Sequence, residues 1–209
     1  MTKIVPAVLV KTKEDYLARM SVIRQLTNRF QLDVIDGEYV DNKTIQLDEI
    51  SRFTEMRMDV HLMVKYPKPH VERAIALNAN NIIIQYECGE DLMPLVERIK
   101  KSGLNAGIAI NPETKLSKLK PFKGLLSHVL IMGYPAGFAG QKMDSSVFDR
   151  LSEVREMFPF AEVGLDGGVT DSNAKKVLQA GFDVVNINTA IFDTEDPLSS
   201  YMKFLEYTL

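Results

Sequence analysis

The stretch 81–111, NIIIQYECGEDLMPLVERIKKSGLNAGIAIN, contains a complete strand–helix–strand unit. Its first part, 81–87, is a short apolar run of the kind that forms a buried strand. In 92–101 the apolar residues recur at three- and four-residue spacing, which predicts a helix that ends before Ser102-Gly103. A second apolar run, 105–111, follows almost at once. The stretch therefore predicts two parallel strands joined by a helical crossover.

The same alternation extends in both directions along the chain. Further strand-like runs occupy 3–10, 30–36, 58–64, 128–133, 162–167 and 183–188, and further helical patterns include 69–77, 146–158, 173–180 and 197–207. No linker rich in Pro, Gly or Ser interrupts these roughly eight repeats, which predicts a single (β/α)₈ barrel domain over residues 1–209. The one longer connection, 38–46, is interpreted as a loop over the barrel mouth.

An open, doubly wound sheet is the structural alternative to a barrel. Such a sheet usually has five to seven strands and a glycine-rich fingerprint after the first one. Here Lys11-Thr12-Lys13 follows the first strand, and the segment contains no glycine. The pattern therefore favours the closed barrel.

The composition limits the classes of partner. The 209 residues are 45% hydrophobic and carry a net charge of −3, which argues against nucleic-acid binding through phosphate neutralisation. No apolar run approaches the roughly 20 residues of a membrane span, and 1–6 does not resemble a signal peptide. The only cysteine, Cys88, rules out an intramolecular disulfide. We therefore expect a cytoplasmic protein that binds neither membrane nor nucleic acid.

Polar residues interrupt several strands near their C-terminal ends, where a barrel places its active site. Asp33 lies in the second strand, His61 in the third and Asp166 near the end of the seventh. Gln31 and Asp33 share an inward face because alternate residues of a barrel strand point inward. The three residues Asp33, His61 and Asp166 are predicted to meet at the mouth, as a divalent-metal site or as acid and base on opposite faces of a substrate. A hydrogen-bonded polar layer is the alternative interpretation.

Glycine and small polar residues gather after the last three strands. They are Gly137 and Gly140, then Gly167 and Gly168, and finally the pair Asn188-Thr189. Such loops can present backbone N–H groups to an anion, and a phosphate site built from the last loops recurs in barrels. The alternative is that these glycines only permit tight turns.

Taken together, these motifs resemble the ribulose-phosphate 3-epimerase family of (β/α)₈ barrels over nearly the whole chain. The matching motifs are 32–37 (LDVIDG), 59–64 (DVHLMV), 111–114 (NPET), 137–142 (GFAGQK) and 166–169 (DGGV). The resemblance implies an isomerase that inverts the carbon beside the ketone of a phosphorylated ketose, with D-ribulose 5-phosphate and D-xylulose 5-phosphate as the substrate pair. It also implies a small phosphorylated sugar as ligand and a homo-oligomer.

The resemblance further implies roles for individual residues. Asp33 and Asp166 match the two acid/base carboxylates, which work through an enediolate. The family's divalent metal is bound by two aspartates and two histidines, which Asp33, Asp166, His61 and, in place of the second histidine, Gln31 match here. An amide oxygen is a weaker ligand for zinc-like metals than imidazole, so Mn or Mg joins Zn and Fe as a candidate ion. The implied substrate contacts are Ala7, Met63, Met132, Gly137, Phe138, Ala139, Gly140, Gly167, Gly168, Asn188 and Thr189.

Several residues at the mouth depart from the family pattern. Ala7 replaces a serine, Gln85 a histidine, and Ala139 and Asn188 replace glycines. Three alternatives therefore stay open: a metal-free acid/base pair of Asp33 and Asp166, an epimerase for another ketose phosphate such as a six-carbon one, and a non-catalytic phosphosugar-binding barrel. Aldolase or decarboxylase chemistry is disfavoured because the segment 33–36, DVID, lacks the lysine of the Asp-x-Lys-x-x-Asp pattern.

Overall fold

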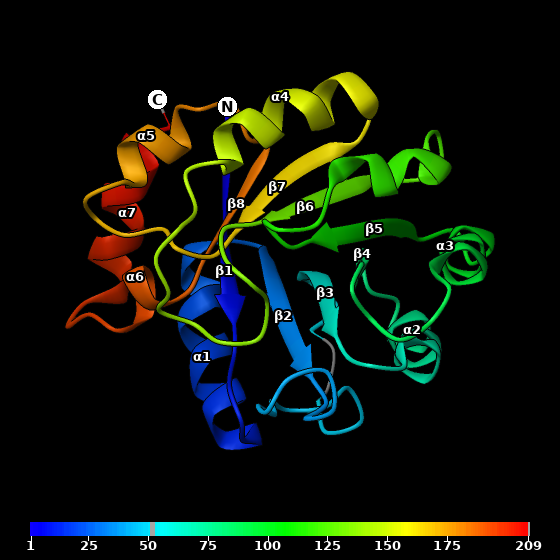
Figure 1. Ribbon diagram of the computed structural model, residues 1–209. Coiled ribbons are helices and arrows are strands. Elements are labelled where there is room, and N and C mark those ends of the chain that lie inside the picture. Colours follow the sequence, from blue (N-terminus) through cyan, green and yellow to red (C-terminus); the bar gives the residue numbers. More distant parts are fainter. Residues whose placement is uncertain (51–52, 209) are drawn as a thin grey trace.

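The computed structural model describes residues 1–50 and 53–208 of the chain and shows a closed barrel of parallel strands (Figure 1). The strands follow one another around the barrel in chain order, and β1 pairs with β8 to close it. They are β1 (Lys3–Val8), β2 (Arg29–Ile35), β3 (Arg57–Met63), β4 (Asn81–Gln85), β5 (Asn105–Ile110), β6 (His128–Met132), β7 (Glu162–Asp166) and β8 (Val184–Ile187). The predicted barrel is therefore confirmed.

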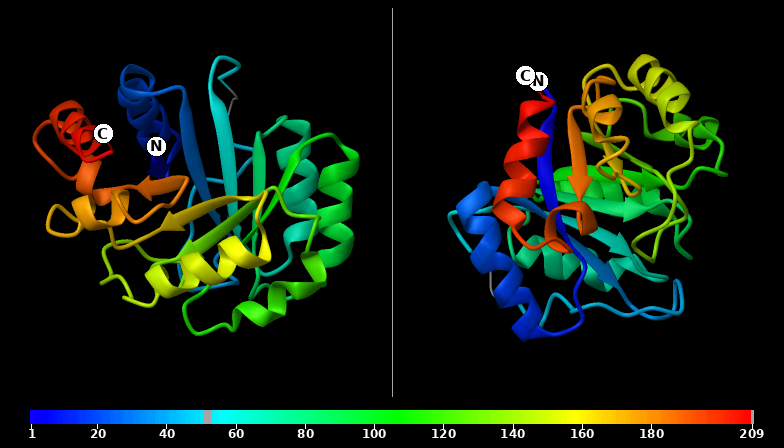
Figure 2. Two further views of the ribbon diagram at one scale, coloured as in Figure 1. Left: turned by 90° about the horizontal axis from the view of Figure 1, so that it is seen from above. Right: turned by 90° about the vertical axis from the view of Figure 1, so that its left-hand side faces the viewer.

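Helices surround the strands on the outside, as the views of Figure 2 show. They are α1 (Lys13–Leu26), α2 (Pro67–Ala76), α3 (Leu92–Lys101), the 3₁₀ helix η1 (Leu116–Phe122), α4 (Val147–Met157), α5 (Ala174–Leu178), α6 (Thr189–Phe192) and α7 (Pro197–Glu206). In the described part of the connection from β2 to β3, residues 36–50 and 53–56, the chain forms no helix. None of the helices in the described residues is long and apolar enough to cross a membrane.

Alternation along each strand separates an outer core from the barrel interior. In β2, Leu32 and Val34 pack outward into the large apolar cluster beneath the helices. Ile35 points inward into a second, smaller cluster with Met63 at the upper end of the barrel. Each fully buried aliphatic side chain contributes roughly 1.5–3 kcal/mol to folding. Because the outer faces supply this stabilisation, the inner face can carry the polar residues Gln31 and Asp33.

An ion-pair network lies inside the N-terminal end of the barrel. Arg29 of β2 donates from Nε to Asp59 Oδ2 at 2.8 Å and from Nη1 to Glu162 Oε1 at 2.9 Å. His128 Nδ1 lies 3.1 Å from Glu162 Oε2, and Asn81 donates to Asp59 Oδ1 at 2.7 Å. Burial opposes ionisation of Glu162, but its bonds with Arg29 and His128 outweigh it and hold the pKa of this carboxyl well below its usual range. The network fills this end of the barrel with paired charge.

The structure differs from the sequence expectations mainly at element ends. β1 ends at Val8 and β4 at Gln85, two residues earlier than predicted in both cases. Beyond Val8 the chain turns to the loop after β2, where Ile45 N–H donates to the Val10 carbonyl at 2.8 Å. Helix α1 lies outside the predicted helical patterns; its buried face consists of Tyr16, Met20 and Ile23.

The loop 38–46 lies at the barrel mouth, as its length suggested. Val40 packs against Gly137 in the loop after β6, and Asn42 Nδ2 donates to the Gly137 carbonyl at 2.7 Å. At the start of the loop, Asp36 accepts hydrogen bonds from the backbone N–H groups of Tyr39 and Lys65. The contacts of Val40 and Asn42 tie the β2 loop to the β6 loop across the mouth, and Asp36 ties it to the segment after β3.

Candidate active site

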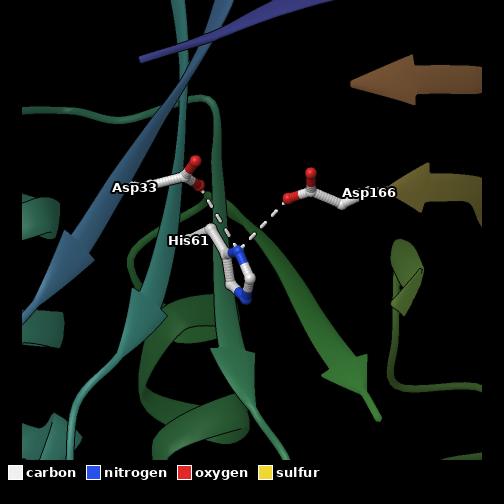
Figure 3. Close-up of side chains that lie close together, drawn as sticks. All are labelled: Asp33, His61 and Asp166. Atoms are coloured by element: carbon white, nitrogen blue, oxygen red, sulfur yellow. Dashed lines mark ion pairs between the residues drawn. The ribbon is translucent and has the colours of Figure 1, made fainter. Parts of the chain in front are cut away.

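Asp33, His61 and Asp166 meet inside the barrel, toward the C-terminal ends of its strands. Asp33 and His61 are register partners on β2 and β3, and Asp166 ends β7. His61 Nδ1 lies 3.4 Å from Asp33 Oδ1 and 3.5 Å from Asp166 Oδ2. Figure 3 shows the two carboxylates converging on the same nitrogen of the imidazole, Asp33 from β2 and Asp166 from β7. The prediction that these residues meet is therefore confirmed.

Burial sets the electrostatics of this centre. Burial, together with the negative charge of Asp166, raises the pKa of Asp33 to about 6. Burial also disfavours the charged imidazolium, but the carboxylates of Asp166 and Asp33 outweigh this cost and raise the pKa of His61 to about 10. The centre thus combines two crowded carboxylates with a basic nitrogen between them, an arrangement suited to storing and moving a proton.

Gln85 orients the imidazole of His61. Gln85 Oε1 lies 2.9 Å from His61 Nε2, and Gln85 Nε2 donates to Glu87 Oε2 at 2.5 Å and to Asn111 Oδ1 at 3.1 Å. A carboxylate accepts hydrogen bonds but does not donate them, so Glu87 turns the Gln85 oxygen toward His61. This oxygen requires a proton on Nε2, which directs Nδ1 to the two aspartates. Such outer partners usually orient metal-binding or catalytic histidines.

Gln31 bridges the two carboxylates from below. Its Nε2 donates to Asp33 Oδ1 at 2.8 Å and to Asp166 Oδ2 at 2.6 Å. Its Oε1 accepts a hydrogen bond from Asn186 Nδ2 at 2.5 Å. In this orientation the amide oxygen points away from the centre.

Three of the four proposed ligands fit a divalent metal. Ligand atoms of Asp33, His61 and Asp166 all lie within 4.8 Å of one another. His61 Nδ1 is buried and makes no hydrogen bond within the described part of the chain, although it faces both carboxylates. Two carboxylates and an imidazole suit zinc, iron or manganese. Gln31 turns its N–H groups toward this point, so its oxygen can join only after the amide reverses.

A cavity opens directly above the centre. Asp33 and Asp166 line it, whereas Gln31 and His61 lie beneath its floor. All of the residues predicted to contact substrate also line it, namely Ala7, Met63, Met132, Gly137, Phe138, Ala139, Gly140, Gly167, Gly168, Asn188 and Thr189. The structure thus brings the carboxylates and the glycine-containing loops into one cavity.

Gly133 lets the ends of β6 and β7 approach closely. Its N–H donates to the Asp166 carbonyl at 2.7 Å. A Cβ atom at this position would overlap the carbonyl oxygen of Gly167. The absence of a side chain at residue 133 therefore allows the hydrogen bond that fixes the backbone of Asp166.

Replacing Gly133 by Ala is expected to lower the free energy of unfolding by about 3 kcal/mol, because the backbone after Asp166 must move. Gly103→Ala is the control: unlike Gly133, Gly103 faces open space, and with its φ of +78° only backbone strain of about 1 kcal/mol is expected. Urea unfolding of both variants measures the difference. Equal losses in the two variants would contradict the steric role of Gly133.

Tyr134 and Asn186 are among the cavity-lining residues that sequence reasoning did not name. Tyr134 lines it with its ring against Gly167, and burial together with the charges of Asp166 and Asp33 raises the pKa of its hydroxyl. Nothing in the sequence around Tyr134 indicated this contact. Asn186 did carry a signal, because it is a polar residue within the apolar run of β8, as Asp33 is within β2.

The fold and the site define a parallel β/α barrel with a carboxylate–histidine centre at its C-terminal mouth. Residues 3–192 match the model of the Ribulose-phosphate 3 epimerase family. The chain is 32% identical over 203 residues to the ribulose-phosphate 3-epimerase of Helicobacter pylori strain J99, which covers 93% of this chain and 92% of that protein. It is 31% identical over 183 residues to the enzyme of the same name from Aquifex aeolicus, covering 84% and 82%. The chain belongs to the ribulose-phosphate 3-epimerase family.

A solved structure supports the fold independently. The crystal structure of 3-hexulose-6-phosphate synthase from Salmonella typhimurium superposes with a TM-score of 0.75 over 99% of this chain and 98% of that one. The two sequences are 13% identical, so this likeness concerns the fold alone.

Proposed function

We propose that this protein is a D-ribulose 5-phosphate 3-epimerase that transfers protons with Asp33 and Asp166. The observation that carries the proposal is that two carboxylates from different strands converge on one buried centre and line the cavity formed by the glycine-containing loops. Family membership supports a phosphorylated sugar as substrate. A pair of opposed carboxylates is the arrangement required to invert a carbon by proton removal and return.

The proton steps balance with these two side chains alone. One carboxylate, in its ionised form, takes the proton from C3 of the ketose. The C3–H electron pair becomes the C2=C3 bond of an enediolate, and the carbonyl oxygen takes up the negative charge. The other aspartate, in its protonated form, then donates a proton to C3 from the opposite face; the C2=C3 electron pair forms the new C3–H bond, and the oxygen at C2 re-forms the carbonyl. Two carboxylates close together favour such a state, because like charges oppose ionisation of both.

Asp33, His61 and Asp166 are the residues that would hold a divalent metal in this centre. When bound, such an ion supplies Lewis-acid stabilisation of developing negative charge on the substrate oxygens. Gln85 would hold the His61 ring with Nδ1 toward the ion. Met63 and Met132 form apolar walls of the cavity beside the carboxylates, where they exclude water from the reacting carbon.

The loops after β6, β7 and β8 are proposed to bind the phosphate. Gly140, Gly167 and Gly168 line the cavity and have positive φ angles, a conformation with which a loop can present successive N–H groups to an anion. Thr189 adds a hydroxyl at the beginning of α6. Backbone N–H groups in such loops bind phosphate oxygens without a positively charged side chain.

Solvent-deuterium incorporation tests the proposal, because it detects proton removal even when net epimerisation is slow. Protein treated with chelator and protein loaded with Mn²⁺ are each incubated in D₂O with D-ribulose 5-phosphate, and with D-fructose 6-phosphate as the six-carbon comparison. We expect deuterium at C3 of the pentulose phosphate together with formation of D-xylulose 5-phosphate. The Mn²⁺-loaded protein is expected to react faster.

The other outcomes decide against the proposal in different ways. Preferential exchange of the six-carbon ketose phosphate would assign the epimerase to another substrate. Saturable binding of both sugars without exchange in either preparation would indicate a phosphosugar-binding protein without catalytic activity.

A further inference from the structure

We propose that Asn186 is a positioning residue that allows the Gln31 amide to reverse, so that Gln31 serves the site both without a cation and with one. Without a cation, the Gln31 N–H groups bridge the two carboxylates by donating a hydrogen bond to each. With a cation, the Gln31 oxygen becomes an additional ligand. The inference rests on the proposed function, because the cation would occupy the centre assigned to that reaction.

The orientation of Gln31 follows from the chemistry of its neighbours. Nε2 has two hydrogens, and both are used, one by Asp33 Oδ1 at 2.8 Å and one by Asp166 Oδ2 at 2.6 Å. Carboxylates accept hydrogen bonds only, so an amide oxygen in this position would be repelled by both. A divalent cation between the carboxylates inverts this preference, because a cation attracts the oxygen and repels the N–H groups.

Reversal of Gln31 is possible only if its outer partner can also reverse. The outer atom Oε1 is buried and accepts from Asn186 Nδ2 at 2.5 Å. After reversal, Gln31 would present a buried N–H group that needs an acceptor. Asn186 Oδ1 is buried and has no hydrogen-bond partner among the described residues, so it is available to accept that bond.

The amide–amide pair is therefore compatible with either state of the centre. When both amides turn, one N–H···O bond between them is replaced by another of the same kind, and the rest of the barrel need not change. A leucine at residue 186 could neither donate nor accept, and an aspartate could only accept. An amide at residue 186 is thus suited to a partner that alternates between donor and acceptor.

Calorimetric titration with Mn²⁺ alone tests this inference in a double-mutant cycle. The proteins are wild type, Asn186→Leu, Gln31→Leu and the double variant, each confirmed as folded by circular dichroism. We expect Asn186→Leu to weaken Mn²⁺ binding ~10-fold, which is the usual lower range for losing an outer partner of a metal ligand. In the Gln31→Leu background the same change is expected to have no effect, because Asn186 acts through Gln31.

A second substitution reverses the expected sign. The carboxylate introduced by Asn186→Asp can only accept a hydrogen bond from Gln31, which turns the Gln31 oxygen toward the cation. The substitution should therefore strengthen Mn²⁺ binding more in protein that keeps Gln31 than in the Gln31→Leu variant. The comparison between backgrounds removes the direct effect of the added charge. A merely structural role of Asn186 would instead weaken binding in every case.

Two results would overturn the inference. One is an equal effect of Asn186 substitution with and without Gln31, and the other is the absence of Mn²⁺ binding to the wild type at millimolar concentration. Neither decides the proposed function, which depends on deuterium exchange: chelated wild-type protein that still exchanges remains an epimerase. Conversely, the Mn²⁺ titrations could give the expected double-mutant cycle while no preparation incorporates deuterium into the substrate. That result would support the role of the Gln31–Asn186 pair and reject the proposed epimerase reaction.

Discussion

Asp33→Asn and Asp166→Asn are each expected to lower the rate of epimerisation by ~10³-fold, within the range that general acid–base groups contribute. The substitutions keep the size of each side chain but remove its capacity to take up a proton. Inversion needs one group on each face of the reacting carbon, so the loss of either aspartate should block net conversion in both directions.

Deuterium exchange distinguishes this mechanism from a general loss of the site. In each variant the remaining carboxylate can still remove the proton that it faces. One variant should therefore exchange only D-ribulose 5-phosphate and the other only D-xylulose 5-phosphate. Asp48→Asn is the matched control, because Asp48 is exposed and pairs with Arg73 outside the cavity. Wild-type epimerisation in either active-site variant would rule out the two-carboxylate mechanism.

Glu162→Gln is expected to destabilise the protein by about 3 kcal/mol at pH 7, because it leaves the buried guanidinium of Arg29 with one carboxylate fewer. The side chain of Arg29 is 5% exposed, so water does not replace the lost partner. Lys3→Met is the control on the same carboxylate. Lys3 Nζ lies 3.4 Å from Glu162 Oε1, and the Lys3 side chain is 60% exposed to solvent. Exposed ion pairs of this kind contribute about 0–1 kcal/mol to stability.

The stabilisation that Glu162 provides is expected to depend on pH in a definite direction. The folded-state pKa of Glu162 is lowered, so its contribution is fully present above the unfolded pKa of about 4.5. The contribution is lost as the pH falls from there through the folded-state pKa. Urea unfolding between pH 7 and pH 3 should therefore show wild type and Glu162→Gln converging in acid. A variant as stable as wild type at pH 7 would contradict the role assigned to this network.

The barrel and the meeting of its three central residues were predictable from sequence. The strand–helix period determines a parallel sheet, and the C-terminal ends of parallel strands lie at one end of a closed barrel. Polar residues in apolar strands, such as Asp33 and His61, were therefore expected at a common site. The exact strand ends were less predictable: the predicted strand continues through Tyr86 and Glu87, but β4 ends at Gln85, and Glu87 accepts a hydrogen bond from Asn111 N–H through its side chain.

The sequence by itself thus determined the barrel and the end of the barrel where Asp33 and Asp166 lie. Only the tertiary structure decided how these groups are held: Gln31 with Asn186, His61 with Gln85, and Arg29 with Glu162. Gln31 and Asn186 are separated by 155 positions in the chain. Their pairing requires the barrel to close, and the direction in which an amide points depends on the charges around it. Neither property is encoded in a local pattern of residues.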